Sequence, residues 1–197
     1  MIRSFVLADL LTLGNGFCGT GAVFASMQYL IHAEPRWIVT AMVLLPVALV
    51  FDFADGRVAR WRRHSSFLGA DLDSLADVVS FGVAPAAIGF ALGLRGALDV
   101  IALLFFVGCG ISRLARFNAT ADALADDTGK VKYFEGTPIP TSVFIIAILA
   151  VLFALGRTGA HMWLGAWNVL GMIFHPVSLI YVISGSAMIS TMRIPKI

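Results

Sequence analysis

Residues 52–77 read DFADGRVARWRRHSSFLGADLDSLAD, and this stretch decides how the chain folds and where its chemistry lies. It places carboxylates in and beside two apolar segments of a chain that is 59% hydrophobic and 13% charged. An isolated charge inside a membrane segment costs about 3 kcal/mol. The stretch therefore predicts two membrane helices whose acids serve a function.

The spacing of the acids puts them on one face of each helix. At about 100° per residue, one face of the first helix, roughly 140° wide, holds Asp52, Asp55, Gly56, Ala59 and Arg60. Steps of three, four and seven residues give the second helix a face with Gly69, Asp73, Asp77 and Ser80. The polar turn between the helices is short, so we expect them to be antiparallel, with both faces converging near one membrane surface.

Converging carboxylates need a positive partner. Without one they would repel one another and take up protons, whereas divalent cations hold them ionised. Oxygen-only ligation suits Mg²⁺ or Mn²⁺ and argues against zinc. We expect two ions, about 4 Å apart, the spacing used to polarise a pyrophosphate during in-line displacement. The alternative is a structural hairpin whose acids pair with Arg57, Arg60, Arg62 and Arg63.

Outside this stretch, the composition predicts an all-α polytopic membrane protein. The mean hydropathy is +0.89. We expect one domain, residues 1–197, forming a bundle of about six transmembrane helices over residues 10–31, 37–60, 69–94, 97–117 and 139–155, with a last one ending near Met192. The apolar residues 162–192 contain His175-Pro176, so they predict either an interfacial piece followed by a span or a kinked helix.

Basic residues set the expected orientation. If both termini and the second and fourth connections share a side, that side holds all 14 lysines and arginines except Arg36, Arg95 and Arg157. This bias predicts a cytoplasmic (inner) membrane protein with its acidic site at the cytoplasmic face. The first apolar run is expected to be a retained span rather than a signal peptide. A net charge of +2 gives no case for a nucleic-acid partner.

Two cysteines and one glycine pair have structural interpretations. Cys18 and Cys109 fall inside predicted spans, as small buried residues that form neither a disulfide nor a metal site. Gly89 and Gly93 form a GxxxG pair, which serves close packing within the chain or between two chains.

The acidic stretch resembles the signature of the CDP-alcohol phosphotransferases. Asp52, Asp55-Gly56, Ala59-Arg60, Gly69, Asp73 and Asp77 match D-x2-D-G-x2-A-R-x8-G-x3-D-x3-D at every defined position. The resemblance implies an enzyme in which a hydroxyl attacks a CDP-linked lipid or alcohol and releases CMP, and it implies a homodimer. It also implies that Asp52, Asp55, Asp73 and Asp77 engage metal, and that Asp77 is the base that accepts the hydroxyl proton.

The nucleotide is expected on the same face. Gly56 and Ala59 carry almost no side chain and leave room for it beside Asp55 and Gly69, while Arg60 and Ser66 are placed for phosphate oxygens. By resemblance, Asn15 in the first span contributes to the pocket for the CDP-linked lipid. The alternative for Asn15 is a hydrogen bond to a neighbouring helix.

Segments outside the signature indicate the acceptor. GADLDSLADVVSFGVAPA, RLARFN, FEGTPIP and ISTMRIPK resemble the phosphatidylserine synthase branch of the family. We therefore expect CDP-diacylglycerol and L-serine as substrates, and phosphatidylserine and CMP as products. The alternatives are another acceptor (choline, glycerol 3-phosphate or inositol phosphate) or a transporter, which would instead carry its acids near mid-bilayer on broken helices.

A pair of arginines in RLARFN is the candidate for a second anionic group. Arg113 and Arg116 can bind a lipid phosphate or the acceptor carboxylate through their guanidinium forks, with Asn118 assisting. The alternative is ordinary anchoring of the helix end at the membrane surface.

Overall fold

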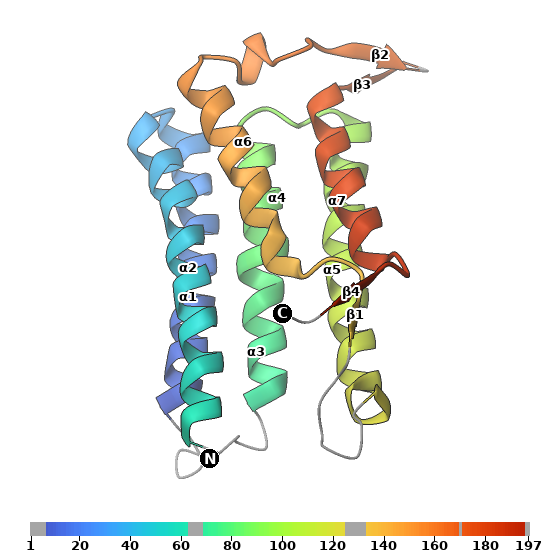
Figure 1. The fold of residues 1–197 in the computed structure, drawn as a ribbon. Coiled ribbons are helices and arrows are strands. Elements are labelled where there is room, and N and C mark those ends of the chain that lie inside the picture. Colours follow the sequence, from blue (N-terminus) through green and yellow to red (C-terminus); the bar gives the residue numbers. More distant parts are fainter. Residues whose placement is uncertain (1–6, 63–68, 125–132, 170, 196–197) are drawn as a thin grey trace.

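The computed structural model describes residues 7–62, 69–124, 133–169 and 171–195, and it confirms an all-α membrane fold (Figure 1). The long helices are α1 (Leu7–His32), α2 (Pro35–Arg62) and α5 (Ala97–Leu124). A further crossing is composite: α3 (Gly69–Asp77) continues through a π-helical segment, η2 (Val78–Val83), into α4 (Ala84–Ala91). The bundle is completed by α6 (Ser142–Ala154) and α7 (Leu179–Ile189).

Among the described residues, four stretches are long and apolar enough to cross a membrane: Ala8–His32, Pro35–Val58, Gly69–Ala91 and Ala97–Ala119. They coincide with the first four predicted spans. The two remaining predicted spans correspond to shorter apolar helices, Ile139–Ala154 and Pro176–Ile189. The fifth predicted range, 139–155, matches to within one residue, whereas the last helix ends at Ile189, three residues before the predicted end at Met192.

The apolar residues 162–192 form a separate piece followed by a helix, and the kinked-helix alternative is wrong. Strands β2 (Trp167–Val169) and β3 (Met172–Phe174) pair antiparallel across one end of the bundle. Pro176 then opens the 3-10 turn Pro176–Ser178 that leads into α7. Proline suits a first helical turn because it lacks an N–H group, which has no partner there.

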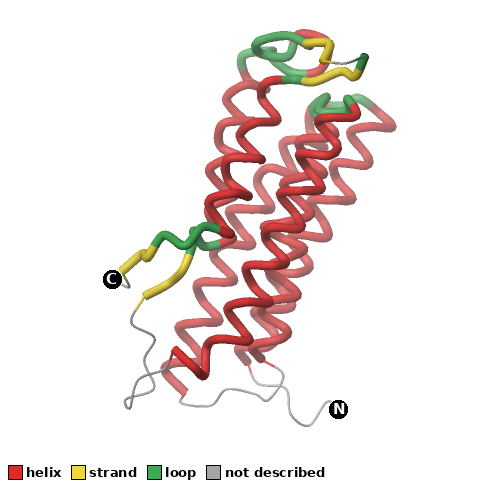
Figure 2. Tube along the Cα trace, turned by 90° about the vertical axis from the view of Figure 1, so that its right-hand side faces the viewer, coloured by secondary structure: helices red, strands yellow, loops and turns green. Residues whose placement is uncertain are grey.

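A second strand pair joins two segments that the sequence singled out. Strand β1 (Tyr133–Glu135) pairs antiparallel with β4 (Arg193–Pro195), so FEGTPIP and ISTMRIPK meet at the side of the bundle (Figure 2). Gly136 follows with φ +76°, and a Cβ there would lie 2.1 Å from the Met188 carbonyl oxygen. Glycine at this position therefore lets the segment dock against the end of α7.

The GxxxG pair serves packing within the chain. The Tyr181 side chain is fully buried beside Gly89, and its hydroxyl donates a hydrogen bond of 2.7 Å to the Pro85 carbonyl. Gly93 lies against the backbone of Gly159. Cys18 and Cys109 are free, as predicted.

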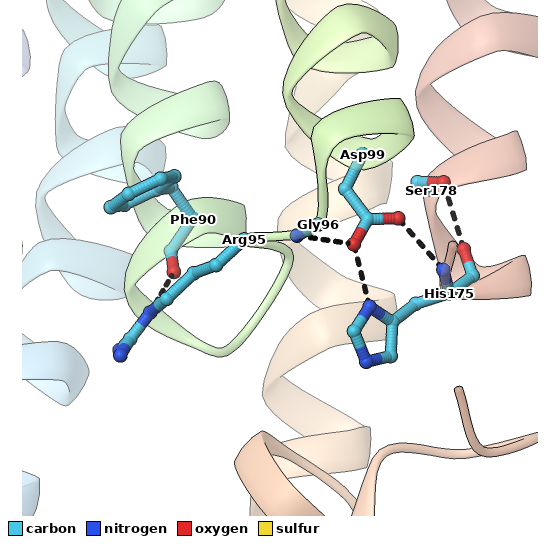
Figure 3. A network of polar contacts seen from close by, with 6 residues as sticks. All are labelled: Phe90, Arg95, Gly96, Asp99, His175 and Ser178. Atoms are coloured by element: carbon cyan, nitrogen blue, oxygen red, sulfur yellow. Dashed lines mark hydrogen bonds and ion pairs between the residues drawn. The ribbon is translucent and has the colours of Figure 1, made fainter. Parts of the chain in front are cut away.

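Helices α5 and α7 are joined at their N-terminal ends by a polar cluster, the Asp99 clasp, made of Gly96, Asp99 and His175 (Figure 3). Asp99 accepts hydrogen bonds from the backbone N–H groups of Gly96 (3.0 Å) and His175 (2.8 Å), and its Oδ2 lies 2.5 Å from His175 Nδ1. The clasp lies at the end of the bundle opposite the acidic stretch.

Candidate active site

Three aspartates from two helices form an acidic triad: Asp52 and Asp55 on α2, and Asp73 on α3. One carboxylate oxygen from each lies within 4.8 Å of the others. Helix α2 ends where α3 begins, at one end of the bundle, so the two acidic faces meet as the spacing predicted (Figure 1).

The acids of the triad repel one another in the part of the chain that the structure describes. The charge on Asp73 interacts unfavourably with those on Asp52 and Asp55, and Asp73 Oδ1 is buried without a hydrogen-bond partner. Among the four candidate arginines, Arg57 is the one whose side chain is described, and it lies over the Phe53 ring at 4.4 Å. The structural-hairpin alternative is therefore wrong for Arg57, while the side chains of Arg60, Arg62 and Arg63 lie outside the described residues.

This donor set fits a divalent cation. All the ligand atoms are carboxylate oxygens, which hard cations such as Mg²⁺ and Mn²⁺ prefer. A bound cation would remove the repulsion and give the orphaned oxygen of Asp73 a partner. The predicted metal chemistry is thus compatible with what these residues offer.

Asp77, the predicted base, lies on α3 one turn beyond Asp73 and does not belong to the 4.8 Å group found among the described residues. Its side chain is 7% exposed, and Asp77 Oδ1 accepts a hydrogen bond of 3.0 Å from Asn15 Nδ2. Its charge also interacts with those of Asp52 and Asp73, so it remains near the triad. Asp77 thus lies near the triad but differs from it in accepting a hydrogen bond from Asn15.

Helix α1 contributes a residue that the sequence analysis did not assign. Thr12 Oγ1 donates a hydrogen bond of 2.8 Å to Asp55 Oδ2. Asn15 lies one helical turn further along α1 and reaches Asp77. Two polar side chains three positions apart in an apolar helix share a face, and this spacing was the available signal.

The predicted nucleotide-binding residues are described in part. A Cβ added at Gly56 would meet nothing within 4 Å, which agrees with open space beside Asp55. Gly69 begins α3 and is partly buried. The backbone of Ala59 and Arg60 continues α2, but their side chains, like all of Ser66, lie outside the described residues.

The arginine pair lies on α5, on the far side of α3 from the triad helix α2 in Figure 1. Arg113 is 9% exposed, stacks over Phe117 at 5.6 Å and interacts electrostatically with Asp77. Arg116 is partly buried. Asn118 is exposed and donates a hydrogen bond of 2.9 Å to Ser74 Oγ on α3. A buried guanidinium that interacts with Asp77 is unlike ordinary anchoring at a membrane surface.

Comparison with known proteins agrees with the signature. A family model described as CDP-alcohol phosphatidyltransferase matches residues 5–181. The chain belongs to this family. As expected for the family, which is generally dependent on divalent metal, the acidic triad supplies suitable ligands. Family membership and the apolar helices also make the chain an integral membrane protein.

Similar curated proteins carry one name, CDP-diacylglycerol–serine O-phosphatidyltransferase. That of Saccharomyces cerevisiae is 43% identical over 200 residues, which cover 100% of this chain and 72% of the relative. That of Bacillus subtilis is 32% identical over 157 residues, covering 76% and 81%. That of Mycobacterium leprae is 33% identical over 176 residues, covering 88% and 53%.

Proposed function

We propose that the chain transfers the phosphatidyl group of CDP-diacylglycerol to the hydroxyl of L-serine, giving phosphatidylserine and CMP. The observation that carries this proposal is the acidic triad beside Asp77, on helices bearing the full signature of the family. The similarity to named serine O-phosphatidyltransferases supports serine as the acceptor. The activity would make the chain an enzyme of phospholipid biosynthesis.

The metal site is assigned to Asp52, Asp55 and Asp73, with Asp77 as a further predicted ligand. Mg²⁺ or Mn²⁺, two ions per site, would neutralise charge on the pyrophosphate and on the leaving CMP. The chain itself must keep the three carboxylates ionised and close together. Antiparallel α2 and α3 do this through the three- and four-residue spacings of their acids.

The reaction exchanges one phosphorus–oxygen bond for another. The serine hydroxyl oxygen forms a bond to the phosphatidyl phosphorus, and the bond from this phosphorus to the CMP oxygen breaks. CMP leaves with the bonding electron pair, and Asp77 accepts the hydroxyl proton. Because Asn15 occupies Asp77 Oδ1, the proton goes to Oδ2.

Substrate contacts are assigned around this centre. The nucleotide is placed against Asp55, Gly56, Ala59 and Gly69, with Arg60 and Ser66 on its phosphates. Arg113 is the assigned partner of the serine carboxylate, since it is buried and electrostatically coupled to Asp77. Arg116 and Asn118 lie on the following turns of α5, where a lipid phosphate or the acceptor can meet them.

We also propose that residues 1–197 act as one domain of a homodimer in a cytoplasmic membrane, with the site at the cytoplasmic face. The basic residues near the acidic end support the orientation. The mass of the detergent-solubilised protein checks the dimer, and accessibility of single cysteines placed near Asp73 checks the face.

The decisive experiment follows CMP release and lipid product from CDP-diacylglycerol in detergent micelles. We expect CMP only when Mg²⁺ or Mn²⁺ and serine are both present, and phosphatidylserine as the lipid product. Activity that survives chelation would contradict the metal assignment. A preference for choline, glycerol 3-phosphate or inositol phosphate would overturn the acceptor and leave the transferase chemistry intact.

A further inference from the structure

One face of α1 packs directly against the helix that carries Asp77. A Cβ at Gly16 would lie 3.6 Å from Ala76 Cβ, while a Cβ at Gly19 would lie 2.3 Å from Ser80 Oγ and 2.6 Å from Ser80 Cα. Asn15 is four residues before Gly19 and lies on the same face of α1. The bare backbone at Gly19 therefore lets α1 approach closely enough for Asn15 to reach Asp77.

The Asn15 side chain donates a hydrogen bond to Asp77. It is 0% exposed, and Nδ2 donates to Asp77 Oδ1 at 3.0 Å. The amide orientation follows from the partner, because an ionised carboxylate only accepts hydrogen bonds. Asn15 Oδ1 is buried and has no hydrogen-bond partner among the described residues, an arrangement that costs about 1–3 kcal/mol. If this position served packing alone, an apolar side chain would avoid the cost of a buried oxygen without a partner.

The backbone around Asn15 is tied to the same helix. Ser80 is three residues beyond Asp77, and its Oγ donates a hydrogen bond of 2.9 Å to the Asn15 carbonyl. Thus α1 contacts the Asp77 turn at both the side chain and the main chain of Asn15. This double attachment fixes where the amide sits relative to the carboxylate.

We infer that Asn15 is a positioning residue that holds Asp77 by one oxygen, so that the other oxygen faces the acceptor hydroxyl; this rests on the proposed function. A neutral amide orients the carboxylate without cancelling its charge, whereas a lysine or arginine would form an ion pair and weaken the base. In this role Asn15 acts through Asp77, and its predicted contact with the CDP-linked lipid is not needed.

The first experiment separates these two roles by steady-state kinetics. Replacing the amide in Asn15→Ala, or in the closer-sized Asn15→Leu, should lower kcat about 10- to 100-fold, the range for lost orienting partners. The KM values for CDP-diacylglycerol and serine should stay close to those of the wild type. Ser26→Ala, which removes another buried hydrogen-bonding side chain of α1, is the control and should keep kcat.

The second experiment asks whether the effect passes through Asp77. In an Asp77→Asn background, Asn15→Ala should cost far less than it does alone, because the group it positions is already gone. A residue with a general structural role would lower activity by the same factor in both backgrounds.

A glycine pair provides a test that leaves the amide in place. Gly19→Ala should lower kcat because its Cβ would collide with the Ser80 backbone and push Asn15 away from Asp77. Gly16→Ala, on the same face but with ordinary contact distances, should keep it.

Three results would overturn the inference: unchanged kcat in folded Asn15→Ala and Asn15→Leu, equal losses in both Asp77 backgrounds, or a raised CDP-diacylglycerol KM with unchanged kcat. A wild-type protein that fails to use serine would overturn the proposed acceptor instead. The same variants are then assayed with the acceptor that it does use.

Discussion

The buried acid Asp99 and the acidic triad lie at opposite ends of the bundle, and their partners differ. Asp99 is fully buried, and two backbone N–H groups and the His175 ring surround its carboxylate (Figure 3). The acids of the triad instead repel one another, and Asp73 Oδ1 has no hydrogen-bond partner in the described part of the chain. Asp99 and the triad all lie on apolar helices, so burial alone does not distinguish the two sites.

The two sites differ in what stabilises the negative charge of their carboxylates, and we infer that this difference distinguishes a structural acid from a functional one. The Asp99 clasp is complete within the chain, which makes it a joint between α5 and α7. On the proposed assignment, a cation and a substrate would compensate the triad, and clusters of mutually repelling acids are typical of functional sites. The following experiments test this contrast.

The largest effect is expected at the acidic triad. Asp52→Asn, Asp55→Asn and Asp73→Asn should each lose more than about 10²-fold in turnover, the scale of one lost electrostatic contact at a reacting centre. Each should still insert and purify, because Asn is easier than Asp to place in a membrane. CMP release and metal titration measure the loss, and near-normal activity in any one variant would refute its assignment as a ligand.

Filling the nucleotide face should nearly abolish binding of CMP. Gly56→Leu places a side chain in open space beside Asp55, and leucine is a good helix former. The matched control is Gly108→Leu on α5, where an added Cβ also meets nothing within 4 Å. Isothermal titration with CMP should show binding to the control only. Unchanged affinity in Gly56→Leu would move the nucleotide elsewhere.

Removing the base should slow chemistry while sparing binding. Asp77→Asn should lower kcat by about 10²-fold or more, as for a lost general base. Single-turnover kinetics and metal titration measure the two properties separately. A large loss of metal affinity would show that Asp77 acts mainly as a fourth ligand.

A smaller and more selective effect is expected from Arg113. Arg113→Ala should raise the serine KM about tenfold or more, since a hydrogen bond to a charged group contributes about 1.5–3 kcal/mol. The KM for CDP-diacylglycerol should change much less. Arg157→Ala, an exposed arginine beyond the end of α6, serves as the control. Equal effects on both substrates would assign Arg113 to the lipid phosphate.

The smallest effect on turnover is expected at the Asp99 clasp. Asp99→Asn should lower the stability of the protein by about 1–3 kcal/mol, because its backbone donors lose a charged acceptor. Turnover per folded molecule should match the wild type. Thermal unfolding in detergent and active-site titration measure the two quantities, and a specific loss of kcat would erase the contrast with the triad.

The triad could be predicted from the sequence because the spacing of its acids involves residues close together in the chain. Spacings of three and four residues place Asp52 with Asp55, and Asp73 with Asp77, on any α-helix. The contribution of Thr12 was not predicted, since it joins residues 43 positions apart and depends on how α1 packs against α2. Whether Asn15 contacts a helix or a ligand was likewise left open, and the hydrogen bond to Asp77 confirms the contact with a neighbouring helix.

Short irregular elements escaped prediction for a different reason. Strands β1 and β4 have three residues each, too few for an alternating pattern to be detected, and their partners are far apart in sequence. The π-helical segment Val78–Val83 contains Gly82 and is followed by Pro85, but neither residue type is specific to a π-helix. Only tertiary contacts specify these elements.

Because α6 is short, the backbone next to it becomes non-helical within the thickness of the membrane. Its 13 residues span about 20 Å, less than the roughly 30 Å of hydrocarbon in a bilayer. Non-helical backbone next to it must then satisfy its hydrogen bonds without water. The Gly136 N–H reaches the Met192 carbonyl at 2.9 Å, and the Thr137 N–H reaches the Ala187 carbonyl at 3.2 Å. These bonds and the β1–β4 pair provide the partners that water would otherwise supply, in the half of the bundle where α3 and its acids lie (Figure 1).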